Sequence, residues 1–470
     1  MEHATQLPPL ASPALRPEWL AGEIAVVGLA RSGKAAAQLL ARAGARVYAS
    51  DYATDVDLET AGRALRDEGV DVQLGGHDMG RLARASLVVA SPGVPPDAPP
   101  FVAARTSGVD IVSEIEIGLR FLPRLSYIAI TGTNGKTTTT ALVGHLLTAV
   151  RRRAATAGNI GTPLTELALS RTPPAWIALE VSSFQLHDTP SIEPTVGVLT
   201  NLSANHLDRY DSVEAYYGDK ALLFRNASAA SNWVTNADDA DVQRMTAGLA
   251  GVQCRFSVRE RSEAYFDRSS GMLVVLGHPL IRREELSLLG DHNVANALAA
   301  SLAVMMADRE HRTHHALNAL RDGLRSFTAL EHRIETVGTF DGVTWINDSK
   351  STNVASTLVA LQGMQSPTVL LLGGRHKGEP YTALAPEIKR TVRTVIAYGE
   401  AAPQIEADLR GLVPLRRLES SFDDVVATAR ALARPGDVVL LSPACSSYDM
   451  FDNYEHRGTV FKRLAATGAS

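Results

Sequence analysis

The segment at residues 131–140, TGTNGKTTTT, combines small residues, a lysine and hydroxyl groups in an order that suits phosphate binding. An apolar run precedes it and a helix-like stretch follows, so a strand, a tight loop and a helix opening meet here. The start of a helix offers unpaired N–H groups and a positive dipole end to an anion. Gly132 and Gly135 allow the backbone to approach phosphates, Lys136 adds a charge, and the hydroxyl of Thr137 can reach a magnesium ion. The segment predicts binding of a nucleoside triphosphate.

This loop departs from the common phosphate-loop pattern at one position. Ile130 stands where that pattern has a glycine, and four consecutive threonines are also compatible with a strand. The order GKTT nevertheless requires a loop at its glycine and lysine, and Asn134 favours the same turn. Phosphate binding is therefore the favoured interpretation, with Thr133, Asn134 and Thr138 completing the cradle.

The size and composition of the chain limit its class. Its 470 residues are too many for one ordinary core, so about two to four domains are expected. A hydrophobic content of 45% with 21% charged residues is typical of a globular enzyme. The net charge of −5 argues against a nucleic-acid partner, which would need a basic surface. We expect small-molecule substrates.

Cysteine usage and hydropathy predict a cytoplasmic location. Cys254 and Cys445 are too far apart in the sequence to suggest a disulfide framework, which fits a reducing compartment. No apolar stretch reaches the roughly 18 to 20 residues of a membrane span. Residues 1–20 are rich in proline and lack the basic start and apolar centre of a secretion signal. We expect a monomer with a poorly ordered tail and no membrane partner.

Short apolar runs alternate with helical patterns along three successive segments, which predicts an α/β fold with parallel sheets and right-handed crossovers. After a tail at 1–20, the expected domains span residues 21–122, 123–328 and 329–470. The expected strands are residues 24–27, 45–50, 87–90, 127–130, 176–181, 196–200, 343–346, 368–372, 392–397 and 438–441. The expected helices are residues 34–43, 141–150, 213–224 and 293–306, and residues 233–280 show β-type alternation.

The turn GLARSG at residues 28–33 follows the first expected strand and resembles a dinucleotide-binding fingerprint. Ala30 occupies the place of the second glycine of that fingerprint. Asp51 lies 18 residues beyond Gly33, near the spacing expected of an acid that binds a ribose. The turn predicts a ligand with a pyrophosphate group, and it does not establish hydride chemistry.

Two further side chains in the middle segment, Glu180 and His206, are candidates for catalysis, whereas the sequence alone gives no reason to single out Lys220. Glu180 ends an apolar run, and a carboxylate at the carboxyl end of a parallel strand beside a phosphate loop is well placed for magnesium. His206, in NHLD, follows the next strand; alone it would suggest a surface loop, but its place at the same sheet edge favours function. Lys220 falls in an expected helix, where a lysine is normally a solvated surface charge.

The third segment supplies cations that could face an anionic ligand. Arg333 and Lys350 lie near its start, where a domain could close over a nucleotide. Lys377 and Ser447 follow strands in Gly-rich and Ser-rich turns, which is where open sheets bind ligands. These two residues are predicted to hold an anionic substrate.

Several of these motifs occur in one order that resembles the Mur ligases over nearly the whole chain beyond the tail. The motifs are GLARSG at 28–33, SPG at 91–93, TGTNGKTTTT at 131–140, GNIGTP at 158–163, LEVSSFQL at 179–186, NLSANHLDRY at 201–210, HNVANAL at 292–298, EHRIE at 331–335, INDSKSTN at 346–353 and SPACSSYDMFDNYEHRG at 442–458. GTNGKT is common to the wider family, including folylpolyglutamate synthases. SFQL, GNIG, INDSK and SPACSSYDMF are typical of the member that adds D-glutamate.

The resemblance implies Rossmann-like N- and C-terminal domains around a central P-loop ATPase-like domain, and an ATP-dependent ligase of peptidoglycan precursors. In the implied reaction, ATP phosphorylates the terminal carboxylate of UDP-N-acetylmuramoyl-L-alanine, and the amine of D-glutamate attacks the acyl phosphate. Because this chemistry brings negative charges together, positioning and cations must supply most of the catalysis. A ligase for another amino acid, a folylpolyglutamate synthase-like enzyme and a nucleotide-gated regulatory protein remain alternatives.

The resemblance also implies catalytic roles. Lys136 would steady the ATP phosphates, while Thr137 and Glu180 would serve one Mg²⁺ ion. His206 and a carbamate formed on Lys220 would serve a second Mg²⁺. Asp219, which precedes Lys220 where the family more often has alanine, would discourage a second anion nearby.

The remaining implied contacts concern the substrates. UDP would contact Gly28, Leu29, Ala30, Arg31, Ser32, Gly33, Asp51 and Ser91. The muramoyl-alanine arm would contact Asn159, Ser182 and Gln185, and the adenine nucleotide would contact Asn293, Arg333 and Asp348. D-Glutamate would contact Lys350, Thr352, Lys377, Ser447 and Tyr454, whose two lysines match its two carboxylates. We expect the third domain to close onto the second, because these cations are far from the phosphate loop in the sequence.

Overall fold

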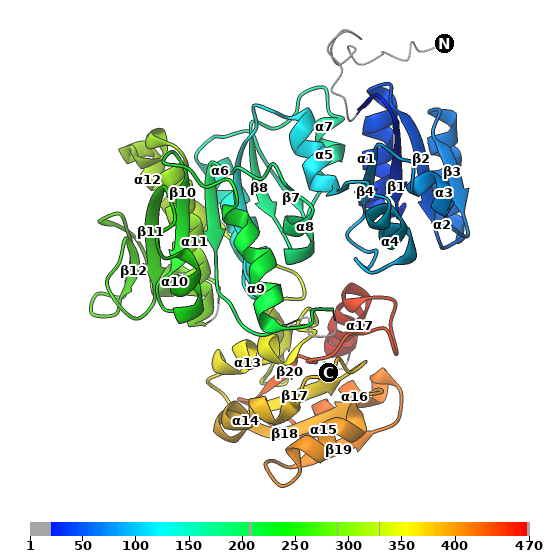
Figure 1. Cartoon of the computed structure of the whole chain (residues 1–470). Coiled ribbons are helices and arrows are strands. Elements are labelled where there is room, and N and C mark those ends of the chain that lie inside the picture. The colour runs from blue at the N-terminus through cyan, green and yellow to red at the C-terminus, as the bar shows by residue number, and fades with distance from the viewer. Residues whose placement is uncertain (1–19, 206–208, 289, 329, 468–470) are drawn as a thin grey trace, which may run out of the picture.

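Figure 1 shows three α/β units, each built around its own sheet. The computed structural model describes residues 20–205, 209–288, 290–328 and 330–467. The N-terminal unit lies beside the central unit, and the C-terminal unit lies below the central unit in the view of Figure 1. The predicted three-domain α/β fold is confirmed, and the domain boundaries drawn after residues 122 and 328 stay predictions.

The N-terminal sheet is parallel, with the order β3-β2-β1-β4-β5 among the described residues. Alternate residues of β1 face opposite layers. Ile24 and Val26 pack with α1, α2 and α5, while Ala25 and Val27 pack with α3 and α4. The elements are β1 (Glu23–Val27), α1 (Arg31–Arg42), β2 (Arg46–Asp51), α2 (Val56–Asp67), β3 (Asp71–Leu74), α3 (Met79–Leu82), β4 (Leu87–Ala90), α4 (Pro99–Thr106), β5 (Ile111–Ser113) and α5 (Glu114–Phe121).

The central sheet has the order β14-β13-β12-β11-β10-β9-β6-β8-β7 in the described part of the chain. It is parallel from β7 to β12, and β13 and β14 extend it in antiparallel fashion. Ile128 and Ile130 of β6 pack with α6, α11 and α12 on one face. Tyr127 and Ala129 face the opposite layer, with α8 and η3.

The bounds of the central elements follow. The strands are β6 (Ser126–Thr131), β7 (Ala154–Gly158), β8 (Trp176–Glu180), β9 (Val196–Leu199), β10 (Asn232–Asn236), β11 (Val252–Ser257), β12 (Ala264–Asp267), β13 (Met272–Val275) and β14 (His278–Arg282). The α-helices are α6 (Lys136–Ala149), α7 (Leu164–Ala168), α8 (Ser183–His187), α9 (Val213–Ala221), α10 (Ala240–Thr246), α11 (Asp291–Ala307) and α12 (His314–Ser326). The short 3-10 helices are η3 (Leu222–Phe224), η4 (Arg283–Glu285) and η5 (Arg309–Arg312).

The C-terminal sheet has the order β15-β16-β20-β17-β18-β19 among the described residues, and only the β15–β16 pair in this sheet is antiparallel. Helices α13, α14 and α15 pack on one face, and α16 and α17 on the other. The strands are β15 (Glu335–Phe340), β16 (Val343–Asn347), β17 (Thr368–Gly373), β18 (Val392–Tyr398), β19 (Leu415–Leu418) and β20 (Val438–Leu441). The helices are α13 (Val354–Gln362), η6 (Tyr381–Leu384), α14 (Ala385–Thr391), α15 (Ala402–Leu409), α16 (Phe422–Leu432) and α17 (Tyr454–Thr467).

Some predicted helices start too late along the chain. The helix expected from residue 34 begins at Arg31, and a larger difference is at α6. The helix expected from residue 141 begins at Lys136, so the threonines that follow belong to its first turns, and their interpretation as a strand is wrong. Gly135 is the N-cap residue of this helix and has a left-handed backbone, φ +79°, so the loop ends there and the helix begins at the next residue. The predicted strands begin and end within one residue of the observed ones.

Candidate active site

The phosphate loop connects β6 to α6, and at two of its glycines a residue with a side chain would clash with its neighbours. A Cβ on Gly132 would lie 2.0 Å from Thr200 Oγ1, and one on Gly135 would lie 2.4 Å from Asn296 Oδ1. Both glycines also have positive φ, +143° and +79°. The loop thereby leaves the N–H groups at the start of α6 directed at a compact site suited to an anion.

Lys136 is held inside this loop. Its Nζ donates to the carbonyl oxygens of Gly132, at 2.9 Å, and Thr133, at 2.8 Å. Desolvation by burial lowers the pKa of Lys136, and the nearby Glu180 opposes this shift. The lysine therefore places a cation at the N-terminus of α6. Phosphate oxygens bound there would compete with the carbonyl oxygens of Gly132 and Thr133 for its N–H donors.

Glu180 ends β8 next to the loop and is almost fully buried. Its Oε1 accepts a hydrogen bond from Asn159 Nδ2 at 2.7 Å, and its carbonyl oxygen accepts one from the Asn159 N–H at 2.9 Å. Its Oε2 has no hydrogen-bond donor among the described residues. A buried carboxylate oxygen without a donor is unfavourable unless a cation or water completes its shell.

This carboxylate fits a magnesium ion, although the described residues supply few other ligands. No group of three or more His, Cys, Asp or Glu that could hold a metal occurs in the part of the chain that the structure describes. Thr137 Oγ1 accepts a hydrogen bond from Arg333 Nη2 at 2.6 Å. His206, the predicted ligand of a second Mg²⁺ ion, lies outside the described residues. Mg²⁺ usually takes few protein carboxylates and completes its shell with phosphates and water, as Glu180 would allow.

Lys220 is buried within α9 and does not form the solvated surface charge that a helical lysine normally would. Its Nζ donates to Gly132 O at 2.7 Å and lies 4.6 Å from the centre of the Tyr216 ring. Burial, and then the charge of Lys136, lower the pKa of Lys220 well below its usual value. The two lysines therefore converge on one carbonyl of the phosphate loop.

Asp219 faces away from that convergence. Its Oδ1 lies 2.9 Å from His187 Nδ1, and its Oδ2 accepts a hydrogen bond from Tyr210 Oη at 2.8 Å. These partners engage both carboxylate oxygens. The hydrogen bond from His187 leads the causes that raise the pKa of that imidazole.

A cleft lies between the phosphate loop and the C-terminal unit. Asp348 is buried there and accepts hydrogen bonds from Ser351 Oγ, at 2.5 Å, and Ser442 Oγ, at 2.7 Å; burial raises its pKa to about 6. Asn293, in the first turn of α11, accepts a hydrogen bond from Asn296 Nδ2 at 3.1 Å. The cleft is lined by Asn134, Gly135, Thr138, Leu288, His292, Asn293, Asn296, Leu330, Arg333, Ile334, Asp348, Lys350, Ser351, Ser356 and Val359.

Among the described residues, two side-chain hydrogen bonds join the units across this cleft. The first is the hydrogen bond from Arg333 to Thr137, and the second runs from Ser356 Oγ to Asn134 Oδ1 at 3.2 Å. Burial lowers the pKa of Arg333, and Glu180 and Asp348 oppose that shift. The structure thus brings a cation of the third segment to the phosphate loop, as domain closure would require.

The five residues expected to hold D-glutamate form two pairs and a single residue. Lys350 Nζ lies 3.6 Å from the centre of the Tyr454 ring, and burial lowers the pKa of Lys350 to about 8. Lys377 Nζ reaches Thr352 Oγ1 at 3.5 Å on an exposed surface. Ser447 is buried in the turn after β20.

The turn at residues 28–33 has the geometry expected of a phosphate-binding turn. Gly28 has φ +89°, and a Cβ on Gly33 would lie 1.8 Å from Gly28 O. Asp51 braces the turn, because its Oδ2 accepts a hydrogen bond from the Leu29 N–H at 2.7 Å. Ala30 caps α1 without a side-chain hydrogen bond, so the helix start keeps its N–H groups. Arg31 instead extends to the central unit, where it binds Glu166.

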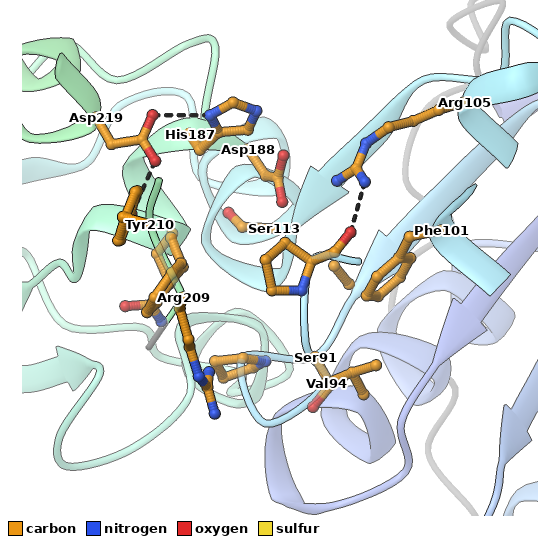
Figure 2. A pocket seen from close by; sticks show the side chains of 15 residues that line it. Ser91, Val94, Phe101, Arg105, Ser113, His187, Asp188, Arg209, Tyr210 and Asp219 are labelled. Atoms are coloured by element: carbon orange, nitrogen blue, oxygen red, sulfur yellow. Dashed lines mark hydrogen bonds and ion pairs between the residues drawn. The ribbon is translucent and has the colours of Figure 1, made fainter. Parts of the chain in front are cut away.

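A second cleft separates the N-terminal and central units (Figure 2). It contains Ser91 and Gln185 of the predicted substrate set, whereas Ser182 caps α8 in a reciprocal bond with Gln185. Sequence reasoning assigned no substrate contact to the charged residues of this cleft, although Arg209 lies in the motif at 201–210 and Asp219 precedes Lys220. These charged residues are Arg105, His187, Asp188, Arg209 and Asp219, and burial raises the pKa of Asp188 to about 6.

Family models match the chain in three consecutive stretches. They are the Mur ligase MurD-like N-terminal domain at residues 22–113, the Mur ligase middle domain at 130–304 and the Mur ligase glutamate ligase domain at 332–445. A Salinibacter ruber protein named UDP-N-acetylmuramoylalanine–D-glutamate ligase is 41% identical over 94% of this chain and 97% of its own. The chain belongs to the Mur ligase family. A relative of the same name from Anaeromyxobacter dehalogenans is 42% identical over 96% of this chain and 99% of its own.

Solved structures of other Mur ligases share the fold. UDP-N-acetylmuramate-alanine ligase MurC from Thermotoga maritima has a TM-score of 0.59 at 20% identity, over 95% of this chain and 99% of its own. MurF ligase from Thermotoga maritima, in complex with ADP, has a TM-score of 0.60 at 16% identity, over 90% and 96% of the two chains. At such identities the likeness concerns the three-domain Mur ligase architecture alone.

Proposed function

We propose that this Mur ligase joins D-glutamate to UDP-N-acetylmuramoyl-L-alanine in peptidoglycan precursor synthesis, converting ATP to ADP and phosphate through an acyl phosphate. The observation that carries the proposal is the match over 94% to 96% of the chain to relatives named for that reaction. The clefts on either side of the central unit support it, because they give the UDP substrate and ATP separate places.

In the proposed first step, a carboxylate oxygen of the substrate attacks the γ-phosphorus of ATP, and ADP leaves. The N–H groups of the loop and Lys136 would hold the β- and γ-phosphates, and Arg333 would offset charge from the opposite side. Glu180, through its free Oε2, would hold Mg²⁺ with Thr137. The Mg²⁺ ion would neutralise part of the negative charge of the ATP phosphates.

Lys220 would support this step as a carbamate. A buried lysine with a lowered pKa has a larger neutral fraction, and only the neutral amine can attack CO₂. The new N–C bond forms as the nitrogen loses a proton, and the product is an anion suited to a cation. Both oxygens of Asp219 are engaged elsewhere, which reduces the repulsion that its sequence position suggested. His206 would provide the other ligand of this second ion.

In the proposed second step, the neutral amine of D-glutamate attacks the carbonyl of the acyl phosphate, the C–O bond to phosphate breaks, and the amine loses a proton. Lys350 and Lys377 would hold the two carboxylates of D-glutamate. Thr352, Ser447 and Tyr454 would complete its pocket. None of the helices among the described residues is long and apolar enough to cross a membrane. We propose a cytoplasmic monomer without nucleic-acid partners.

Phosphate release from ATP tests the proposal. With UDP-N-acetylmuramoyl-L-alanine present, phosphate release should require D-glutamate, and L-alanine or a diamino acid should not replace it. Glutamate with folate in place of the UDP substrate should give no release. A preference for another amino acid would identify a sister ligase, and release with folate in place of the UDP substrate would identify a folylpolyglutamate synthase-like enzyme. Release that depends on no amino acid would favour a regulatory nucleotide switch.

A further inference from the structure

The side chain of Arg31 links two domains. This arginine opens α1 at the turn expected to hold UDP, yet its Nε and Nη2 donate to the two carboxylate oxygens of Glu166, at 3.0 and 3.2 Å. Its Nη1 donates to Gly161 O at 3.2 Å. Glu166 belongs to α7, beside the central sheet, and Figure 1 shows α7 next to the N-terminal unit. All three guanidinium nitrogens are therefore directed across the domain boundary.

The loop that Arg31 reaches also holds Glu180. Gly161 ends the segment 158–161, in which Asn159 donates to Glu180 through both its backbone N–H and its side-chain amide, at 2.9 and 2.7 Å. This segment is tight at both ends. A Cβ on Gly158 would lie 2.2 Å from Glu180 O, and one on Gly161 would lie 2.5 Å from Thr156 O. We therefore expect a displacement at Gly161 to move Asn159 and, through its two hydrogen bonds, the Glu180 carboxylate.

We propose that Arg31 and Glu166 form an interdomain strap that positions Glu180 through segment 158–161, and that Arg31 does not bind the UDP phosphates. The inference rests on the proposed function, because Glu180 is assigned there to phosphoryl transfer. It replaces the UDP contact that the family resemblance implied for Arg31.

The electrostatics of the turn agree with this assignment. Hydrogen bonding to Glu166 is the leading cause that raises the pKa of Arg31, so the carboxylate offsets much of the guanidinium charge. The turn has another anion site, because Ala30 precedes α1 as its N-cap residue and makes no side-chain hydrogen bond to the helix start. A diphosphate can therefore bind backbone N–H groups while Arg31 stays on Glu166.

The exposed fractions of the two side chains, 61% and 43%, indicate where the effect will be seen. Exposed ion pairs contribute little to folding, so loss of the strap should leave the melting temperature nearly unchanged. Placement of a catalytic carboxylate, by contrast, affects the turnover rate directly. We expect a change in kcat with little change in binding of UDP.

The experiment compares Arg31→Met, Glu166→Gln and the double variant. Each single change should lower kcat about fivefold, and the double variant should fall no further, because either change releases the same strap. Calorimetric affinity for UDP should stay within about twofold of the wild type in Glu166→Gln and within about threefold in Arg31→Met. Glu68→Gln is the matched control, because Glu68 binds Arg42 of α1 through the same two nitrogens, at 2.9 and 3.2 Å, inside one domain. It should leave kcat unchanged.

Three results would overturn the strap. The first is a tenfold or greater loss of UDP affinity in Arg31→Met, which would make Arg31 a phosphate ligand. The second is tighter UDP binding in Glu166→Gln, which would mean that Glu166 holds Arg31 back from the ligand. The third is a double variant whose loss equals the product of the single losses.

Hydrogen exchange separates failure of the strap from failure of the proposed function. The amides of residues 158–161 should exchange faster in Arg31→Met and Glu166→Gln than in the wild type, and at the wild-type rate in Glu68→Gln. This readout and the UDP titration need no ligase activity, so they test the strap whichever amino acid the wild-type enzyme accepts. Unchanged exchange in both strap variants would reject it.

Discussion

A cleft lies on each side of the central unit, but the contacts that join the units differ on the two sides. Towards the N-terminal unit, Glu114 is buried and accepts hydrogen bonds from the N–H and Oγ1 of Thr165, at 2.6 and 2.7 Å. Glu116 accepts two more from Ser191, at 3.0 and 2.6 Å. Towards the C-terminal unit, the Arg333–Thr137 contact crosses a solvent-accessible cleft. A buried carboxylate fixed to backbone resists separation, whereas side chains across a cleft can part at modest cost.

The difference suggests that one interface stays fixed during turnover while the other opens and closes. We expect the N-terminal and central units to move as one body during turnover, and the C-terminal unit to open and close over the nucleotide. The four predictions that follow probe the two interfaces, beginning with the phosphate loop on which the moving unit closes.

Replacing Lys136 with alanine should have the largest effect. The change removes the cation that would meet the transferred phosphate, and we expect kcat for phosphate release to fall about 1000-fold or more. Steady-state phosphate release with all substrates present measures this loss. Full turnover by the variant would remove the loop from the mechanism, and with it the reason for the C-terminal unit to close there.

Replacing Arg333 with methionine should lower kcat about 100-fold, because the moving unit would then close without its cation. The melting temperature should change little, since the residue contacts the loop across a cleft. Arg325→Met is the control: Arg325 is an exposed arginine of α12 paired with Glu285, and its loss should leave kcat intact. Equal kinetic losses in the two variants would contradict a specific role for Arg333.

Replacing Glu114 with alanine should affect stability more than turnover. The Thr165 N–H and hydroxyl would lose their acceptor in a buried place, which costs about 2 kcal/mol of unfolding free energy. Glu114→Gln keeps an acceptor oxygen and should lose less, and exposed Glu284→Ala should lie within about 0.5 kcal/mol of the wild type. Thermal and denaturant unfolding measure the free energies of unfolding of the three variants. A 100-fold loss of kcat in folded Glu114→Ala would show that this interface does more than hold two units together.

The sequence anticipated the most apolar strands and the phosphate loop, because apolar runs and glycine positions act locally. It did not anticipate the shorter or more polar strands, such as β3, β7 and β19. It misplaced the start of α6, since threonine-rich segments favour strands and the left-handed Gly135 decides the helix start. It could not reveal the bonds of Glu114 to Thr165, because these residues are 51 positions apart and follow no motif.

Some residues of the candidate site could also be predicted from local sequence patterns, and others could not. Lys136 and Glu180 follow from local patterns at the ends of strands. The burial of Lys220 had no local signal, and only the family resemblance drew attention to that lysine. Arg31 shows the opposite limit: its position in a phosphate-type turn suggested a ligand contact, while its side chain crosses to Glu166 on another unit. The direction of a long, flexible side chain depends on packing between domains, which spacing along the chain does not encode.

The smallest expected effect is a pH dependence at the moving interface. Burial lowers the pKa of Lys350 to about 8, so its charge is present at pH 7 and is lost as the pH rises through 8. If this ammonium holds a carboxylate of D-glutamate, KM for D-glutamate should increase about fivefold between pH 7 and pH 9, while KM for the UDP substrate stays flat. Lys350→Arg keeps a charged group throughout this range, so KM for D-glutamate in that variant should not rise with pH. A rise of equal size in wild type and variant would assign the titration to another group, and a flat wild-type profile would place D-glutamate away from Lys350.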